Sequence, residues 1–271
     1  MLDLQQSFTH EKPLFDHYPL NIFNRNARDS PAAYGLIVLN YSKSSIDKWL
    51  TESIWSGARI RACADGGSNE LHQFTLDKTE TRLGHFTPNF IIGDLDSVKS
   101  ETRQFYEQKF NVPFIEMKDQ DTTDFTKCLE EFQKKMDAEP LEHIYVFCTF
   151  AGRFDQAMSI IHTLYLYPKL NIFLVSDQDV TFLLKPGLNR IHGIQSPMCG
   201  TYCGLIPFAG PVKALTNGLQ WNLDEKMELN YNTLISTSNA YSEPKNEFVT
   251  VNTPESLVWS MTFAETVQDD Q

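Results

Sequence analysis

The feature of this sequence that most constrains its fold is an alternation of short apolar runs and helix-like stretches between residues 34 and 175. The apolar runs lie at 35–39, 59–64, 90–92, 112–115, 144–147 and 172–175. The helix-like stretches between them lie at 45–55, 68–74, 101–110, 123–136 and 155–167. Short apolar strands joined by helices predict a mostly parallel sheet with helices on both faces and right-handed connections.

The pattern changes after about residue 177, where helix-like stretches give way to short β-rich runs bounded by Gly, Pro and Asn. These runs lie at 180–184, 202–207, 227–229, 234–236, 248–251 and 257–263. Strands of this length with turn residues between them predict an all-β domain, either a small antiparallel sandwich or a barrel.

The two patterns divide the chain into three parts. Residues 1–33 show no sustained period, and we expect an amino-terminal arm on the surface with no chemistry of its own. An α/β domain with a Rossmann-like parallel sheet is expected at 34–177, and the antiparallel β domain at 178–271.

The charge balance narrows the range of partners. Lys and Arg total 23 against 35 for Asp and Glu, which gives a net charge of −12. Such a chain repels phosphate backbones, so we expect no nucleic-acid partner. A polyanionic small molecule can still bind an acidic protein when divalent cations lie between its phosphates and the protein carboxylates.

Cysteine usage and hydropathy indicate the compartment. The five cysteines lie in otherwise apolar runs and form no Cys-x-x-Cys pair, so we expect buried, reduced thiols. No apolar stretch approaches the roughly 20 residues of a membrane helix, and residues 1–10 lack a basic end followed by an apolar core. We expect a cytoplasmic protein that binds no membrane.

Acidic residues follow several of the predicted strands. Those after the second to fifth strands are Asp65, then Asp94 and Asp96, then Asp119, Asp121 and Asp124, then Asp155 with the neighbouring Arg153. A lone Asp at such a position is usually a turn or a helix cap. Several carboxylates at one sheet edge repel one another, however, and Mg²⁺ prefers carboxylates together with substrate phosphates. The residues themselves therefore predict a magnesium–phosphate site.

Two further features support a phosphate ligand. Gly66 and Gly67 would let the backbone approach a phosphate closely at the start of a helix, although the sequence has no Walker segment and no complete Gly-x-Gly-x-x-Gly. Arg153 suits a bidentate clamp on an oxyanion, and the alternative is an ion pair with Asp155.

Four motifs in this order resemble the thiamine pyrophosphokinase family. They are Ala64-Asp65-Gly66-Gly67-Ser68-Asn69, Gly93-Asp94-Leu95-Asp96-Ser97, the segment Asp119-Gln120-Asp121-Thr122-Thr123-Asp124-Phe125-Thr126-Lys127, and Gly152-Arg153-Phe154-Asp155-Gln156. Similar segments continue through 203–207, 218–223, 236–239 and 249–251, so the resemblance covers roughly residues 34–263.

The resemblance implies an α/β nucleotide domain, a carboxy-terminal β-sandwich and a homodimer with active sites at the subunit interface. It also implies roles for individual residues. Asp94, Asp96 and Asp124 would hold Mg²⁺ and, with Asp65 and Arg153, form the catalytic set. The ATP contacts would be Asp65, Gly66, Gly67, Asn69, Thr123, Arg153 and Asp155. The thiamine contacts would be Gln120, Trp221, Ser236 and Asn239.

The chemistry of Trp221 fits that role, because thiamine is a flat cation and an indole face attracts such cations. The alternative for Trp221 is the core of the β domain. Two positions depart from the family pattern: Cys148-Thr149 stand where a Gly-Gly pair is usual, and Leu95 stands where Phe is usual.

The activity that the resemblance implies is attack of thiamine's hydroxyl on the β-phosphorus of ATP, with AMP leaving and an aspartate taking up the proton late. Two alternatives share the acidic set: a magnesium-dependent phosphohydrolase, and a non-catalytic thiamine or nucleotide sensor. The β-domain motifs weigh against the first, and the intact carboxylates weigh against the second.

Overall fold

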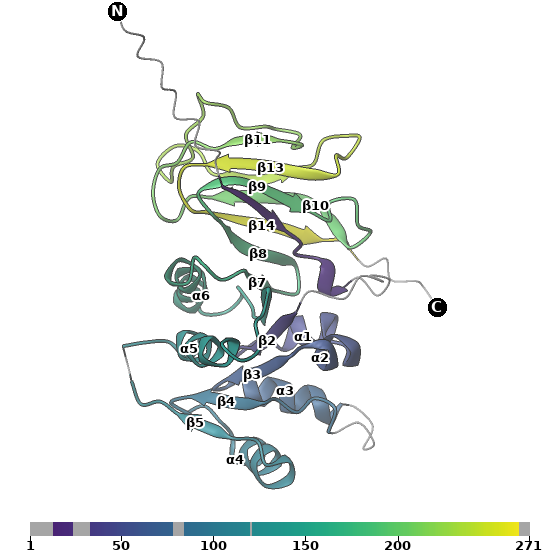
Figure 1. Cartoon of the computed structure of the whole chain (residues 1–271), viewed down its shortest axis with the longest axis vertical. Coiled ribbons are helices and arrows are strands. Elements are labelled where there is room, and N and C mark those ends of the chain that lie inside the picture. Colours follow the sequence, from purple (N-terminus) through teal and green to yellow (C-terminus); the bar gives the residue numbers. More distant parts are fainter. Residues whose placement is uncertain (1–12, 24–32, 78–83, 120, 266–271) are drawn as a thin grey trace, which may run out of the picture.

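The computed structural model describes residues 13–23, 33–77, 84–119 and 121–265. Within these ranges the strands form a ten-stranded sheet, ordered β12-β10-β14-β8-β7-β6-β2-β3-β4-β5, and a four-stranded sheet, ordered β1-β9-β13-β11. The molecule is therefore built on one long mixed sheet with a second sheet at one end (Figure 1).

One half of the long sheet is parallel. Its strands are β2 (Tyr34–Val38), β3 (Ile60–Ala64), β4 (Phe90–Gly93), β5 (Phe114–Glu116), β6 (His143–Phe147) and β7 (Ile172–Val175). All six lie within two residues of the apolar runs in the sequence, so the predicted parallel sheet is confirmed. These strands are almost continuously apolar because helices bury them on both faces.

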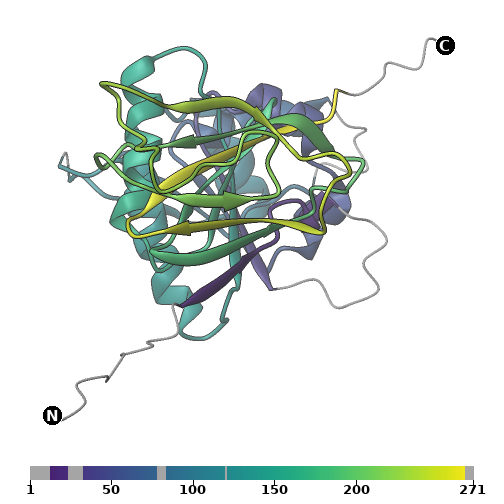
Figure 2. The same ribbon diagram turned by 90° about the horizontal axis from the view of Figure 1, so that it is seen from above.

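The helices form two layers around this half. One layer holds α1 (Lys43–Trp49), α2 (Glu52–Gly57), α3 (Gly67–Leu76) and α4 (Ser100–Arg103), with a π-helical turn at Gln104–Lys109; the other holds α5 (Asp124–Met136) and α6 (Phe154–Leu166). Figures 1 and 2 show α5 and α6 on the opposite side of the strands from α1 to α3. The single helix expected at 45–55 is two helices, because Thr51 caps the second by accepting from the Ile54 N–H at 3.3 Å.

The sheet continues past the expected boundary at residue 177. Strand β8 (Asp179–Leu184) pairs antiparallel with β7, and β14 (Leu257–Phe263), β10 (Cys199–Ile206) and β12 (Ser236–Ala240) extend the sheet in antiparallel register. The boundary itself lies in a tight turn in which Ser176 Oγ accepts from the N–H groups of Gln178 and Asp179.

The second sheet contains β1 (Leu14–His17), β9 (Gly187–His192), β13 (Phe248–Thr253) and β11 (Leu215–Asn217). Its buried residues share a core with the antiparallel half of the long sheet: Ile191 and Val251 belong to the same cluster as Trp259 and Met261. Figure 1 shows this sheet at the end of the molecule remote from β4 and β5.

Three expectations need correction here. Residues 14–17 of the expected arm form β1, which pairs in parallel with β9 and is part of the sheet. The run at 227–229 is not a strand and makes only an isolated bridge, from Leu229 to Val212. Strands β9 and β11 lie outside the runs identified in the sequence. None of the helices in the described ranges is long and apolar enough to cross a membrane.

Candidate functional site

A pocket of about 250 Å³ lies at the carboxyl ends of the parallel strands. Residues after β2, β3, β4 and β6 line it, together with the first turn of α5 and the first two turns of α6. The strand order reverses between β2 and β6, since β3, β4 and β5 extend to one side and β7 to the other. Open α/β sheets bind their ligands at such a switch point.

Three carboxylates converge beside this pocket, and two of them, those of Asp65 and Asp124, belong to residues that line it. One oxygen from each of Asp65, Asp94 and Asp124 lies within 4.8 Å of the other two. Gly93, with φ +156°, makes the approach possible, because a Cβ there would lie 2.8 Å from the Asp65 Cβ and 3.0 Å from the Asp124 Oδ1. Of the acidic residues expected at this edge, Asp65, Asp94 and Asp124 therefore converge, with Asp65 a full member of the group.

Asp65 is the most deeply placed of the three. Its side chain is buried, its backbone has φ +41°, and Oδ1 has no hydrogen-bond partner among the described residues. Burial raises the pKa of this carboxyl; hydrogen bonds from the Ser97 hydroxyl and the Gly66 N–H oppose the shift, whereas the negative charges of Asp124 and Asp94 add to it. A buried acceptor without a donor, beside two more carboxylates, fits a bound cation.

Lys127, which ends the third motif but was given no role from the sequence, lies beside this group. Its side chain is only 2% exposed, and its Nζ lies 3.1 Å from Asp124 Oδ1. Three negative charges and one positive charge leave a formal charge of −2, which suits one divalent cation. The spacing of three residues on α5 was the available signal, because such pairs lie on one helix face.

Asp96 lies apart from this group, although it was expected with Asp94 and Asp124 as a metal ligand. It is exposed at the pocket, where it accepts from Ser97 Oγ at 2.9 Å, and its own N–H donates to Asp94 Oδ1 at 3.3 Å. Leu95 between the two aspartates has φ +64°.

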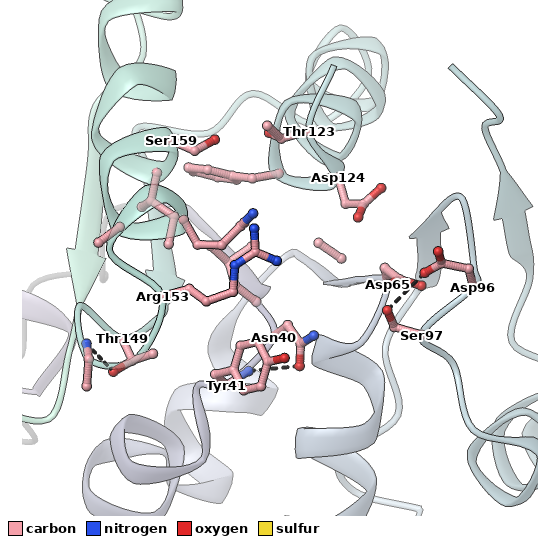
Figure 3. Close-up of a pocket in the computed structure, with 17 residues that line it drawn as sticks. Asn40, Tyr41, Asp65, Asp96, Ser97, Thr123, Asp124, Thr149, Arg153 and Ser159 are labelled. Carbon is pink, nitrogen blue, oxygen red and sulfur yellow. Dashed lines mark hydrogen bonds between the residues drawn. The ribbon is translucent and has the colours of Figure 1, made fainter. Parts of the chain in front are cut away.

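Arg153 lies on the other side of the pocket from the acidic residues (Figure 3). It makes the ion pair with Asp155 that the sequence left as an alternative, through Nε to Oδ1 at 3.1 Å. Both side chains are about two-thirds exposed, so the pair contributes little to stability and can open toward a ligand. Thr149, at one of the two positions where the sequence departs from the pattern that the resemblance implies, accepts from the Ala151 N–H at 3.1 Å and shapes this loop.

The two glycines after β3 have packing roles in the structure. A Cβ on Gly67 would lie 2.1 Å from the Val38 carbonyl oxygen, so glycine lets α3 pack against β2. A Cβ on Gly66 would lie 2.5 Å from the Asn40 side-chain nitrogen. Neither glycine lines the described pocket.

Two other expected ATP contacts also have structural partners. Asn69 donates to the Ser97 carbonyl at 2.8 Å and accepts from the Lys99 N–H at 3.0 Å, so it fixes the loop that carries Asp94 and Asp96. Thr123 caps α5 by accepting from the Thr126 N–H at 3.2 Å, and it also lines the pocket.

The expected thiamine contacts in the β half come together in one place. Asn239, which is buried, donates to the Trp221 carbonyl at 2.9 Å and to Ser236 Oγ at 3.2 Å, and it accepts from the Trp221 N–H at 3.3 Å. The Trp221 side chain is 57% exposed, so the alternative of a core position is wrong. None of the three lines the pocket described above, and Gln120 lies outside the described residues.

Sequence reasoning also missed Asn40 and Tyr41, which follow β2 and line the pocket. Their position directly after a parallel strand was the available signal, as it was for Asp65 after β3.

Fold and pocket together define an α/β protein whose acidic site, at the switch point of a parallel sheet, suits a phosphorylated ligand held through a divalent cation. A second, β-rich half carries an exposed Trp held by a buried Asn.

Comparison with known proteins gives the family. Residues 51–174 match the model for the thiamin pyrophosphokinase catalytic domain, and residues 189–258 match that for its vitamin B1 binding domain. Thiamine pyrophosphokinase 1 of Oryza sativa is 35% identical, over 87% of this chain and 89% of its own length. Thiamine pyrophosphokinase 1 of Arabidopsis thaliana is 35% identical over 86% and 87%. The chain belongs to the thiamine pyrophosphokinase family, as its motifs predicted.

Solved structures agree on the fold. The crystal structure of yeast thiamin pyrophosphokinase superposes with a TM-score of 0.77 at 23% identity, covering 92% of this chain and 91% of that one. Thiamin pyrophosphokinase from Candida albicans gives 0.74 at 22% identity, covering 92% and 93%. The mixed α/β fold is therefore shared with structures of this family.

Proposed function

We propose that this chain is an ATP:thiamine diphosphotransferase, which transfers the β,γ-diphosphate of ATP to the hydroxyl of thiamine and releases AMP. The observation that carries the proposal is the convergence of Asp65, Asp94, Asp124 and Lys127 at the switch point of the sheet, in a chain of this family. Such a site suits a triphosphate whose negative charge is offset by a cation.

The acidic group is the proposed site of Mg²⁺. Asp65, Asp94 and Asp124 supply the three converging carboxylates, and Asp96, which lies outside that group, is proposed as a further ligand from the lining of the same pocket. When bound there, Mg²⁺ would offset charge on the phosphate oxygens. Lys127 and the Asp94 N–H both donate to Asp124 Oδ1 and so fix the orientation of that carboxylate.

The remaining steps fall to side chains around the pocket. Arg153 exchanges Asp155 for phosphate oxygens of ATP and aligns the chain of phosphates. The hydroxyl oxygen of thiamine forms a bond to the β-phosphorus of ATP. At the same time, the bond breaks between the β-phosphorus and the oxygen that bridges it to the α-phosphorus. AMP keeps the bridging oxygen, and the hydroxyl proton passes late to an aspartate of the group and then to water.

Thiamine is proposed to bind against Trp221, with Ser236 and Asn239 supporting that position. The exposed indole suits a flat cation, and the hydrogen bonds from Asn239 hold its backbone. Because this trio does not line the acidic pocket of the same chain, we propose a homodimer in which the β half of one protomer faces the acidic pocket of its partner.

The roles of the two domains and the location of the protein in the cell belong to the same proposal. We assign residues 34–177 to a Rossmann-like nucleotide domain and 178–271 to a thiamine-binding β-sandwich; the two matched family models lie on either side of that boundary. We also propose a cytoplasmic location, which the five free, buried cysteines support.

The proposal is tested by incubating the purified protein with thiamine, ATP and Mg²⁺ and identifying every product. Thiamine diphosphate with AMP supports it. Phosphate release without a thiamine product would instead identify a phosphohydrolase, and binding without turnover would identify a sensor.

A further inference from the structure

We propose that Tyr41 is the stacking platform for the nucleobase of ATP, an inference that rests on the proposed function for the identity of the nucleotide. The nucleoside end of the triphosphate would lie against the Tyr41 ring, at the β2 side of the switch point.

Tyr41 is held in an unusual backbone conformation. Its φ is +58°, which bulky residues rarely adopt and which persists only where the surrounding structure holds it. The Asn40 side chain fixes it here, because its Oδ1 accepts from the Tyr41 N–H at 2.9 Å. Asn40 in turn lies over Gly66, where any Cβ would displace it. Three residues therefore act together to place this ring.

The ring is placed beside the pocket and is not packed in the core. Tyr41 is 65% exposed and still lines the pocket, so burial does not account for the strained turn. Figure 3 shows Tyr41 and Arg153 on one side of the pocket and Asp65, Asp96 and Asp124 on the other. An exposed aromatic face at a ligand site suits a planar group that can stack on it.

The positions of the acidic group, Arg153 and Tyr41 around the pocket indicate which part of the nucleotide lies against Tyr41. A triphosphate bound by the acidic group through a cation and by Arg153 has its phosphates between those two sides, so its sugar and base would lie on the Arg153 side, where Tyr41 also lies. Ala157 and Ile160 of α6 supply apolar wall in the same pocket. Stacking of a base on an aromatic ring tolerates any purine, so Tyr41 provides affinity for the base without choosing adenine over guanine.

The test compares two probes that differ in the nucleoside. Binding of α,β-methylene-ATP and of inorganic triphosphate, each with Mg²⁺, is measured by calorimetry on the whole protein without thiamine. The variants are Tyr41→Phe, which keeps a ring, and Tyr41→Asn and Tyr41→Gly, which remove it and tolerate a positive φ. Phe154→Ala is the matched control, because Phe154 is 74% exposed beside Arg153 but does not line the pocket.

We expect Tyr41→Asn and Tyr41→Gly to weaken binding of the ATP analogue about 5- to 100-fold and to leave triphosphate binding unchanged. Tyr41→Phe and Phe154→Ala should bind both probes within about twofold of the wild type. Unchanged binding of the analogue by folded Tyr41→Asn or Tyr41→Gly, or an equal loss for both probes, would overturn the inference. Thiamine turnover of the wild type is measured in parallel: its absence, with Tyr41-dependent binding intact, would refute the proposed function alone.

Discussion

Gly93 illustrates how single residues build this site. A side chain there would enter the space between Asp65 and Asp124, so glycine is what lets two carboxylates from different loops approach. Positive backbone angles at Asp65 and Leu95 turn the same loops. Of the five described non-Gly residues with positive φ, Tyr41 and Asp65 line the pocket and Leu95 lies between Asp94 and Asp96, a concentration that is typical of functional sites.

At this scale we expect Asp65→Asn, Asp94→Asn and Asp124→Asn each to lower kcat by at least about 100-fold, because each removes charge that would hold the metal. Asp121→Asn is the matched control, since Asp121 is exposed in the same motif and outside the group, and it should keep near-normal kcat. Steady-state kinetics across a magnesium titration makes the comparison. Near-normal kcat in any folded member of the first three would remove that residue from the site.

Thermal melts without metal separate the same variants further. Asp65→Asn and Asp94→Asn should keep or raise Tm, because repulsion among the carboxylates falls. Asp124→Asn should lower Tm by several degrees, because it leaves the buried Lys127 ammonium without its partner. Equal Tm changes for all three would contradict the role of Lys127.

Part of this site could be predicted from the sequence. The position of Asp65, Asp94 and Asp124 after parallel strands was enough to bring them to one edge. Which aspartates form the group was not predictable from the sequence. Asp65 joins it because its backbone is left-handed and Gly93 leaves space for its side chain, whereas the Asp96 carboxylate accepts a hydrogen bond from Ser97. The spacing of apolar residues predicts neither the burial of a single polar side chain nor a positive φ at a non-Gly residue.

At the scale of elements, β1 is the clearest departure from expectation. His17 in this strand lies between the sheets, with Nε2 2.9 Å from Asn189 Oδ1 of β9 and its ring 5.1 Å from that of Phe182 in β8. Neither β1 nor β9 was predicted, because neither has a clear apolar run. Strand β1 has only four residues, and the buried positions of β9 include Asn189. The parallel strands were predictable because burial on both faces demands continuous apolar runs.

His17 gives this strand a pH dependence. Burial lowers its pKa from 6.5 to about 4; the hydrogen bond to Asn189 opposes the shift, Asp16 also opposes it, and Lys185 and His143 add to it. Between pH 6.5 and about pH 4, His17 is therefore protonated in the unfolded chain but neutral in the folded chain. This contribution is fully present above pH 6.5 and is lost as the pH falls to about 4, by about 3 kcal/mol in total.

We expect urea unfolding of His17→Gln to lose less stability than the wild type between pH 7 and pH 4.5, because glutamine does not gain this charge. Stability at pH 7 is the reference for each protein, because His17 is largely neutral there in both the folded and the unfolded chain. Parallel loss of stability in the two proteins would show that β1 is not held in this way.

The contact of α3 with β2 gives a second prediction at this scale. Gly67→Ala should lower the free energy of unfolding by roughly 2–3 kcal/mol, because the new methyl group would meet the Val38 carbonyl and shift the helix that follows Asp65. Gly84→Ala is the control, since Gly84 is exposed and its nearest neighbour is a Phe110 ring edge at 3.2 Å. Similar stability of the two variants would argue against a packing role for Gly67.

At the scale of the whole molecule, the acidic pocket and the proposed thiamine-binding surface lie in separate places. The acidic pocket lies in the parallel half of the long sheet, and Trp221 lies in the β half outside that pocket. A dimer with shared sites would join them, and mixing two defective variants tests this. Asp124→Asn and Trp221→Ala, mixed and refolded together at low thiamine concentration, should recover up to about one quarter of wild-type activity, because half of the sites in a mixed dimer combine two intact surfaces.

Each variant refolded alone is the control for that experiment and should stay defective. If the mixture gained nothing although mixed dimers formed, the two surfaces would have to act within one chain. Fully active monomers in sedimentation at assay concentration would lead to the same conclusion.

The central claim, transfer of a diphosphate in one step, is tested most directly by following labelled phosphorus in ATP during turnover with thiamine and Mg²⁺. We expect label in the α position to appear only in AMP and label in the β or γ position to appear together in thiamine diphosphate, in amounts equal to AMP. Label from the γ position in thiamine monophosphate, with the α and β labels in ADP, would contradict the account.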